Sequence, residues 1–377
     1  MPVYQYDVNS AYPSALRHVP NLQHGEWVES KTVPAMTDFG VYHVRSRAYR
    51  SDVPAPLFCR HLNGTVSFPM QVIGWYWAPE IAALDEYERA GLGEYEILEG
   101  WLFKPNDIDD KPFHFIEPLY MKRRALKLAG DGAHVGLKLA LNSLYGKLAQ
   151  QVGWRMTDKG LRIPPYHQLE YAGFATSFCR ALVLQAAMLD MESVIAFETD
   201  ALFTTRPLPL KIGSNLGEWE VTEYRSLSYV QSGVYFGTKA NGNTLIKSRG
   251  IDRGMMDVDS VAKAFTAESA ESRTLPTSLT RFVGAGIALA QNWSKWRTWQ
   301  TVNKRITLEP TGKRIHANCG LEDGSPLRLN VWHETMCPFL AALHSAEYPI
   351  EWLNPNPAMT ELAELREDEK DYGESEL

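Results

Sequence analysis

Residues 137–150, which read LKLALNSLYGKLAQ, combine several side chains that could serve one substrate. Lys138, Asn142 and Tyr145 follow the i, i+4, i+7 spacing, which places them on one face of an α-helix. A lysine can meet the charge of a triphosphate, and a tyrosine can lie against the flat face of a base. Only a few types of enzyme need both groups on one helix, so the segment predicts a nucleotide-handling site.

Carboxylates occur at two places that flank this helix in the sequence. Asp7 lies within residues 6–14 (YDVNSAYPS), and residues 195–203 (IAFETDALF) form an apolar strand interrupted by Glu198 and Asp200. An isolated aspartate most often belongs to a turn. Phosphoryl transfer assisted by two divalent ions requires carboxylate ligands, which magnesium prefers. Together with the lysine helix, Asp7 and Asp200 are therefore candidate metal ligands.

The three segments resemble motifs of the family B DNA polymerases, particularly the protein-primed kind found in bacteriophages. The helix matches the fingers motif K-x-x-x-N-S-x-Y-G, and residues 6–14 match D-x-x-S-L-Y-P-S with Ala11 in place of leucine. Residues 195–203 resemble a degenerate Y-x-D-T-D-S hairpin, in which Glu198 replaces the first aspartate and Asp200 keeps the second. Three motifs in the order that the family uses are much harder to produce by chance than one.

The resemblance implies an α+β fold, namely a right-hand polymerase with an antiparallel palm sheet, helical fingers and a thumb. A chain of 377 residues is long enough for several such subdomains. The expected organisation is a first palm part (1–20), an insertion resembling terminal-protein region 1 (21–118), fingers (119–150), a shortened second insertion (151–170), a second palm part (171–250), and a thumb with an acidic tail (251–377).

The implied activity is DNA-templated DNA synthesis, in which deoxynucleotides are added to a primer hydroxyl by two-metal phosphoryl transfer. Asp7, Asp200 and the backbone carbonyl of Val8 are the expected ligands of two Mg²⁺ ions, for which Mn²⁺ could substitute. Glu198 keeps the charge of the aspartate that it replaces, so we expect tuned metal affinity and retained catalysis. Because only six residues precede Asp7, a proofreading exonuclease is not expected in this chain.

The nucleotide site implied by the resemblance combines cations with aromatic rings. Arg123 and Lys127 lie one helical turn apart and would clamp a triphosphate together with Lys138. Without the neighbouring motif, a solvated helix face would be the preferred interpretation of the first two. Tyr12 and Tyr145 would lie against the sugar and base and exclude a 2′-hydroxyl. The expected nucleotide-binding residues are Tyr12, Arg123, Lys127, Lys138, Asn142 and Tyr145.

The expected DNA contacts are more scattered along the chain. The resemblance implies that Asn142 also contacts the templating base, and that Gly146 lets the template backbone approach closely. Tyr235 matches the primer-holding K-x-Y element, but Gly233 replaces its lysine, so Lys247 or Arg249 would supply the phosphate contact. The expected DNA-binding residues are Ser10, Ser143, Gly146, Thr199, Tyr235, Lys247 and Arg249.

Composition agrees with these partners once the positions of the charges are considered. The net charge of -7 would disfavour nucleic acid, but residues 122–162 are mostly basic and the acidic excess lies after residue 360. No apolar run reaches membrane-spanning length, and the four cysteines lack C-x-x-C spacing. We expect a cytoplasmic protein of an infected bacterial host that binds primer-template DNA, deoxynucleoside triphosphates and either a terminal protein or a separate exonuclease subunit.

Two alternatives remain open at the level of sequence. Glu198, Ala201 and Gly233 depart from the family motifs, which favours a weak or inactive pseudo-polymerase that binds primer-template or a terminal protein. The same metal site would also serve a polymerase that starts from a protein hydroxyl or without a primer. Primer extension separates the first alternative from an active enzyme.

Overall fold

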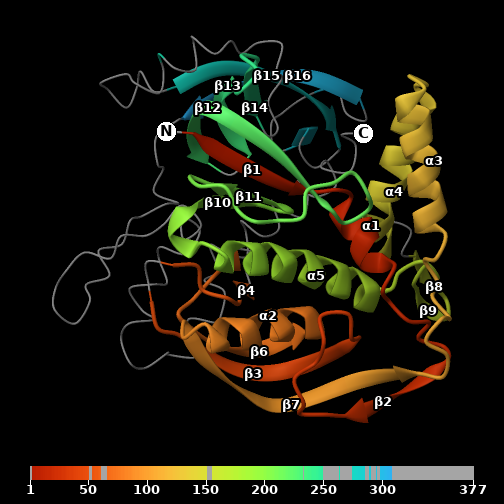
Figure 1. The fold of residues 1–377 in the computed structure, drawn as a ribbon. Helices are drawn as coiled ribbons and strands as arrows, with labels where there is room; N and C mark the ends of the chain where they lie inside the picture. Colours follow the sequence, from red (N-terminus) through yellow and green to blue (C-terminus); the bar gives the residue numbers. More distant parts are fainter. Residues whose placement is uncertain are drawn as a thin grey trace. The chain divides into compact units, whose positions relative to one another are not determined.

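The computed structural model describes residues 2–50, 53–60, 66–150, 155–231, 233–248, 263, 274–284, 288–289, 294 and 298–307 (Figure 1). The chain divides into two compact units. What we call the first unit comprises Gln5–Leu57 and Met70–Val221, and the second unit comprises Met1–Tyr4, Phe58–Pro69 and Thr222–Leu377. Each unit is described by itself below.

Antiparallel strands form the centre of the first unit. In the sheet order β10-β11-β1-β12, this unit contains β10, β11, β1 from Gln5 onward and the start of β12. β10 and β11 make a tight hairpin in which Glu198 is the Cα partner of Ala201. The strands are β1 (Val3–Val8), β10 (Val194–Glu198), β11 (Ala201–Thr204) and β12 (Trp219–Gln231).

Helix α5 (Leu169–Met188) packs beside this hairpin, and 12 of its 20 residues are buried (Figure 1). Its sequence, LEYAGFATSFCRALVLQAAM, is apolar around most of its circumference, which is typical of a helix covered on several sides. Phe174 and Ala175 are fully buried in one core cluster with residues of α1 (Ala11–Leu16).

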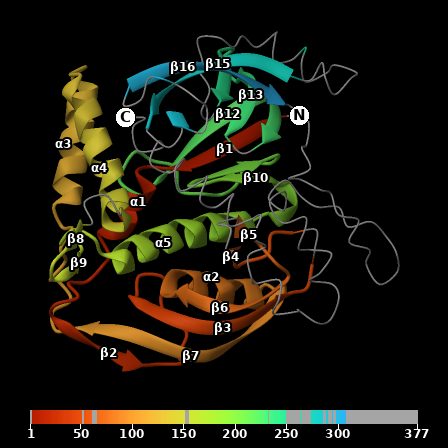
Figure 2. The same cartoon turned by 180° about the vertical axis from the view of Figure 1, so that it is seen from behind.

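The insertion after α1 is a four-stranded antiparallel sheet with one helix on its inner face (Figure 2). The order is β2-β7-β3-β6, and alternating burial along β3 shows that one face is covered. Helix α2 (Ala78–Arg89) lies between this sheet and α5. The strands are β2 (Gly25–Glu29), β3 (Gly40–Ala48), β6 (Gln71–Trp77) and β7 (Gly93–Pro105).

An ion pair joins α2 to α5. Arg180 Nε donates to Glu80 Oε1 at 2.7 Å, and the glutamate side chain is only 4% exposed. A buried carboxylate is costly unless it is paired, so the arginine compensates Glu80 across the helix interface. Arg180 therefore anchors α5 to α2.

Two helices form a hairpin that carries most of the predicted basic residues. They are α3 (Ile116–Leu128) and α4 (Ala133–Ala149), and Gly130 occupies the left-handed conformation in the connection with φ +71°. Ile116 and Tyr120 of α3, and Leu141 and Leu148 of α4, are the buried residues of the pair. The expected helical hairpin is therefore present, and a small ribbon of β8 (Arg155–Thr157) and β9 (Gly160–Arg162) follows it.

The second unit is built from antiparallel strands in its described part. The remainder of β12 pairs with β13, which pairs with β14. A separate ladder joins β15 to β16, and another joins β4 to β5. Most of the predicted thumb and all of the acidic tail lie outside the described residues. The strands are β4 (Cys59–Arg60), β5 (Val66–Ser67), β13 (Val234–Lys239), β14 (Thr244–Ser248), β15 (Thr274–Val283) and β16 (Thr298–Thr307).

Helices and antiparallel strands thus coexist as the predicted α+β class requires. Among the residues that the structure describes, no helix is both long and apolar enough to cross a bilayer.

Removing the arginine of the buried pair should destabilise the first unit. We expect Arg180→Met to lower the free energy of unfolding by about 2 kcal/mol, because Glu80 is left buried without a partner. The double variant Glu80→Gln with Arg180→Met should recover most of this loss. Chemical denaturation measures both, and Arg45→Met, which breaks an exposed pair with Glu96, is the matched control. Equal losses at positions 180 and 45 would contradict the account.

His18 should make stability depend on pH. Its ring stacks on Phe178 of α5 at 5.3 Å, and burial lowers its pKa to about 4, with Arg17 and Lys111 adding to the effect. The unfolded chain therefore binds this proton first, and stability is lost as the pH falls from about 6.5 to 4. After allowance for partial exposure, His18→Phe should gain about 1 to 2 kcal/mol relative to the parent between pH 7 and pH 4.5 in denaturant titrations. Parallel pH curves would contradict this.

Candidate active site

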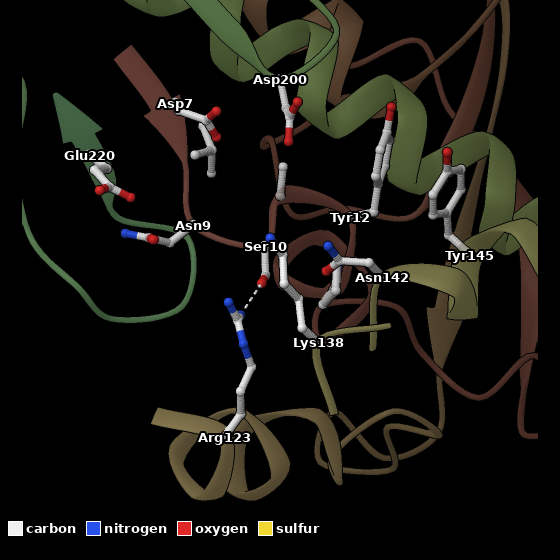
Figure 3. Close-up of a pocket in the computed structure, with 13 residues that line it drawn as sticks. Asp7, Asn9, Ser10, Tyr12, Arg123, Lys138, Asn142, Tyr145, Asp200 and Glu220 are labelled. Atoms are coloured by element: carbon white, nitrogen blue, oxygen red, sulfur yellow. Dashed lines mark hydrogen bonds between the residues drawn. The ribbon is translucent and has the colours of Figure 1, made fainter. Parts of the chain in front are cut away.

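A cavity of about 480 Å³ lies in the first unit where strand ends meet the helical hairpin (Figure 3). Its walls come from the end of β1, the start of α1, helices α3 and α4, the β10–β11 turn and the start of β12. The residues that line it are Asp7, Val8, Asn9, Ser10, Ala11, Tyr12, Pro13, Arg123, Lys138, Asn142, Tyr145, Asp200 and Glu220.

Two of the predicted metal ligands meet at one end of this cavity. The Val8 backbone N–H donates to the carbonyl oxygen of Asp200 at 3.2 Å, so the residue after Asp7 is tied to the hairpin turn. Burial raises the pKa of the Asp200 carboxyl, whereas Asp7 is exposed. Within the described ranges, no group of three His, Cys, Asp or Glu side chains could hold a metal ion by itself. A cation here would need further oxygen ligands, such as a backbone carbonyl or substrate phosphates.

Both carboxylate-bearing turns contain a strained residue. Ser10, with φ +51°, and Thr199, with φ +57°, are the only described non-glycine residues in the left-handed region. A side chain with a Cβ adopts this conformation at an energetic cost, which functional sites often retain. In this chain the two turns place Asp7 and Asp200 beside one another. Ser10 lines the cavity, whereas Thr199 is exposed outside it.

Cations face the carboxylates from the hairpin (Figure 3). Arg123 Nη1 donates to Ser10 Oγ at 3.1 Å, and its Nε is buried without a hydrogen-bond partner. Lys138 approaches from α4 and lines the same cavity. Lys127 is exposed on α3 and does not line the cavity, so two of the three predicted cations are brought together.

Two stacked tyrosines close another side. The rings of Tyr12 and Tyr145 have centroids 3.8 Å apart and planes inclined by 22°. Burial raises the pKa of the Tyr12 phenol far above its usual value, and Tyr145, Cys179 and Asp200 add to the shift. The phenol is therefore neutral at any ordinary pH. The pair presents an uncharged aromatic wall between the cations and α5.

The helical spacing of the α4 motif is reproduced in the cavity. Lys138, Asn142 and Tyr145 all line it, whereas Ser143 and Gly146 do not. Ser143 Oγ donates to the Ala140 carbonyl at 3.1 Å, which is a local helix contact. A Cβ built on Gly146 would have no described atom within 4 Å, so internal packing does not require glycine there.

Sequence reasoning did not assign four cavity residues to the site, and two of them, Asn9 and Glu220, are polar. Asn9 Nδ2 donates to the Gly213 carbonyl at 2.9 Å, which holds the turn after Asp7. Glu220 belongs to a Glu-x-Glu pair with Glu218 at the start of β12, and this alternation was the signal available. Glu198 ends β10, is half-buried, and is not among the cavity residues.

The predicted primer contacts lie in the second unit. Tyr235 is buried in β13, where its ring stacks on Tyr229 with centroids 5.9 Å apart. Lys247 is exposed in β14 as the Cα partner of Tyr235, so the two positions are neighbours. Arg249 lies outside the described residues.

Known proteins similar to this chain are DNA polymerases. Residues 1–158 match a family model described as DNA polymerase type B, organellar and viral. A probable DNA polymerase of Neurospora intermedia is 28% identical over 162 residues, which are 38% of this chain and 16% of that protein. A DNA-directed DNA polymerase of Enterobacteria phage PRD1 is 29% identical over 181 residues, which are 43% of this chain and 28% of the phage protein. The chain thus spans less than a third of the length of either relative.

The fold is also similar to a solved polymerase. Phi29 DNA polymerase complexed with primer-template DNA and incoming nucleotide substrates gives a TM-score of 0.52 at 16% sequence identity, covering 82% of this chain and 58% of that one. This likeness concerns the fold alone. The family match over residues 1–158 covers two of the three motifs found in the sequence, residues 6–14 and 137–150. Residues 1–158 are therefore similar to the type B DNA polymerases of organelles and viruses.

Proposed function

We propose that this protein is a DNA-templated DNA polymerase that adds deoxynucleotides to a primer hydroxyl by two-metal phosphoryl transfer. The observation that carries the proposal is the meeting of Asp7 and Asp200 with Arg123 and Lys138 in one cavity. Carboxylates opposite cations are what a magnesium-bound triphosphate requires. The fold and family described above support the same reaction class.

The donor set fits a hard divalent cation. Asp7, Asp200 and the Val8 carbonyl would hold Mg²⁺, with Mn²⁺ as a substitute, and Glu220 adds a third carboxylate to the cavity. Burial without a compensating cation accounts for the raised pKa of Asp200, and bound metal would remove that penalty. When bound, the two ions would supply charge neutralisation for the attacking and leaving oxygens. Glu198 would tune the site from outside the cavity.

The residues opposite the carboxylates suit a deoxynucleoside triphosphate. Arg123 offers an unpaired Nε donor, and Lys138 offers an ammonium, so both would hold phosphate oxygens. Tyr12 and Tyr145 would pack against the sugar and base and leave no space for a 2′-hydroxyl. Asn142 would contact the nascent base pair from α4. Lys127 shares a helix with Arg123 and would join the phosphates only from outside the cavity.

DNA is the proposed macromolecular partner. The phi29 enzyme named above was solved with primer-template DNA and incoming nucleotides, which supports the same substrates here. Ser10, Ser143, Gly146 and Thr199 would contact DNA around the cavity, and the open space beside Gly146 would admit a template backbone. Tyr235, Lys247 and Arg249 are proposed to hold the primer. A terminal protein or a separate exonuclease subunit would be a further partner in the host cytoplasm.

The second candidate is a pseudo-polymerase that binds DNA without turnover. Glu198 outside the cavity and Gly233 in place of lysine favour it, because both weaken motifs that the family uses. The retained pair Asp7 and Asp200 favours an active enzyme.

Primer extension tests the proposed activity directly. Asp7→Ala and Asp200→Ala should each lower the extension rate by about a thousandfold or more in Mg²⁺, since each removes an essential ligand. Asp158→Ala, in the exposed turn between β8 and β9, is the matched control and should retain parental activity. An inactive parent, or equal rates in parent and both active-site variants, would favour the pseudo-polymerase.

The aromatic wall should select the sugar. Tyr12→Val opens space beside the expected 2′ position, so the preference for deoxynucleotides over ribonucleotides should fall by about tenfold or more. Single-nucleotide incorporation of dGTP and GTP measures the ratio of kcat/KM values. Tyr166→Val, an exposed tyrosine outside the cavity, should leave this ratio unchanged. If the Tyr12 variant prefers dGTP over GTP as strongly as the parent does, Tyr12 does not select the sugar.

A further inference from the structure

Residues 212–217, here called the 212–217 loop, bind α3 from outside the cavity. The Tyr120 hydroxyl donates to the Ser214 carbonyl at 3.0 Å, and Arg124 Nη1 donates to Asn215 Oδ1 at 2.8 Å. Tyr120 and Arg124 are one helical turn apart, so they point to the same side of α3. Tyr120 is also buried, which fixes its ring. The loop therefore holds one face of the helix that carries Arg123.

The same loop binds the turn that follows Asp7. Asn9 Nδ2 donates to the Gly213 carbonyl, and the Gly217 N–H donates to the Asn9 carbonyl, both at 2.9 Å. The Asn9 N–H in turn donates to the Glu218 carbonyl at 2.9 Å. Asn9 is thus held through its backbone and its side chain. Because Asn9 is two residues from Asp7, the loop also fixes the end of β1.

Internal contacts make the loop rigid enough to transmit these constraints. Glu218 pairs with Lys211 at 2.7 Å and accepts the Asn215 N–H at 2.9 Å, and these contacts lower the pKa of its carboxyl to about 2. A Cβ on Gly213 would lie 1.9 Å from Glu218 Oε2, so a side chain there would displace the carboxylate from these contacts. Gly217, with φ +80°, adopts a conformation that favours glycine. One carboxylate therefore ties the two ends of the loop together.

The hairpin needs such support because little of it is buried. Only Ile116 and Tyr120 of α3 are buried, and most of the helix is exposed. Elements with few buried contacts open easily. Arg123 also reaches the turn through Ser10, but under the proposed function its guanidinium would turn to the substrate phosphates. Tyr120 and Arg124 do not line the cavity, so substrate bound there would not compete for their contacts.

We propose that the 212–217 loop is a positioning element that sets the distance between the carboxylates of the strand ends and the cations of the helical hairpin. Tyr120, Arg124 and Asn215 are its positioning residues, and none of them touches substrate. The inference rests on the proposed polymerase function. Loss of the loop contact would leave the reacting groups intact but let Arg123 drift from the triphosphate, so nucleotide affinity falls before chemistry does.

Steady-state kinetics of single-nucleotide addition tests this split. Asn215→Ala and Arg124→Ala should each raise the KM for deoxynucleotide about five- to tenfold with kcat within about twofold. The double variant should have the same KM as each single variant, because each substitution removes the same Arg124–Asn215 hydrogen bond. Asn215→Asp keeps the acceptor for Arg124 and should restore the parental KM. Lys122→Ala, which removes an exposed cation of the same helix, is the matched control.

Two further measurements separate this proposal from the polymerase assignment. Equilibrium binding of a deoxynucleotide to the protein with a dideoxy-terminated primer-template and Mg²⁺ should show the same loss of affinity without turnover. Suppose that the parent synthesises DNA. If the variants then keep the parental KM, or if kcat and thermal stability fall as strongly as KM rises, the positioning role is wrong but the polymerase assignment stands. If the parent neither binds nucleotide nor extends primers, the polymerase assignment fails. Hydrogen exchange then tests the positioning role of the loop. Faster amide exchange in α3 but not in α5 of the Asn215→Ala variant supports this role, and unchanged exchange in α3 overturns it.

Discussion

One main-chain hydrogen bond, from the Val8 N–H to the Asp200 carbonyl, is the contact on which the site depends. It fastens the end of the first strand to a hairpin turn that lies far away in the sequence. Both carboxylates flank this bond, so neither needs a long side chain to reach a common cavity. Two residues in the left-handed conformation lie close to it in the chain: Thr199 directly before Asp200, and Ser10 two residues after Val8. The folding energy of the surrounding sheet and of α5 maintains this strained junction.

Around that junction the charges are separated by the type of element that carries them. Strand ends contribute the acidic groups, which include Glu220, and the exposed helical hairpin contributes Arg123 and Lys138. The stacked pair of Tyr12 and Tyr145 fills the remaining side with neutral rings. The acidic strand ends and the basic helical hairpin therefore lie on two sides of a cavity that could hold a polyanion with its metal ions. The contacts of α3 with Ser214 and Asn215 hold the helical hairpin opposite the carboxylates.

Local patterns in the sequence predicted local features well. Helical spacing was enough to group Lys138, Asn142 and Tyr145, because i, i+4 and i+7 positions share a face whatever the rest of the fold does. Spacing could not reveal that Lys127 faces away from the cavity, since its direction depends on how α3 docks. Asn9 and Glu220 were missed because their places depend on pairings between distant strands. The pairing order of the inserted sheet was equally inaccessible, because alternation identifies a strand but not its neighbour.

The buried pair between Glu80 and Arg180 has a mechanical consequence. It couples α2 and the inserted sheet to α5, because a shift of α2 along α5 would leave the buried Glu80 carboxylate without its partner. A force applied to the outer face of that sheet is transmitted to the helix beneath the β10–β11 hairpin. A displacement of the insertion would therefore shift α5, which packs on β11 next to the turn that carries Asp200.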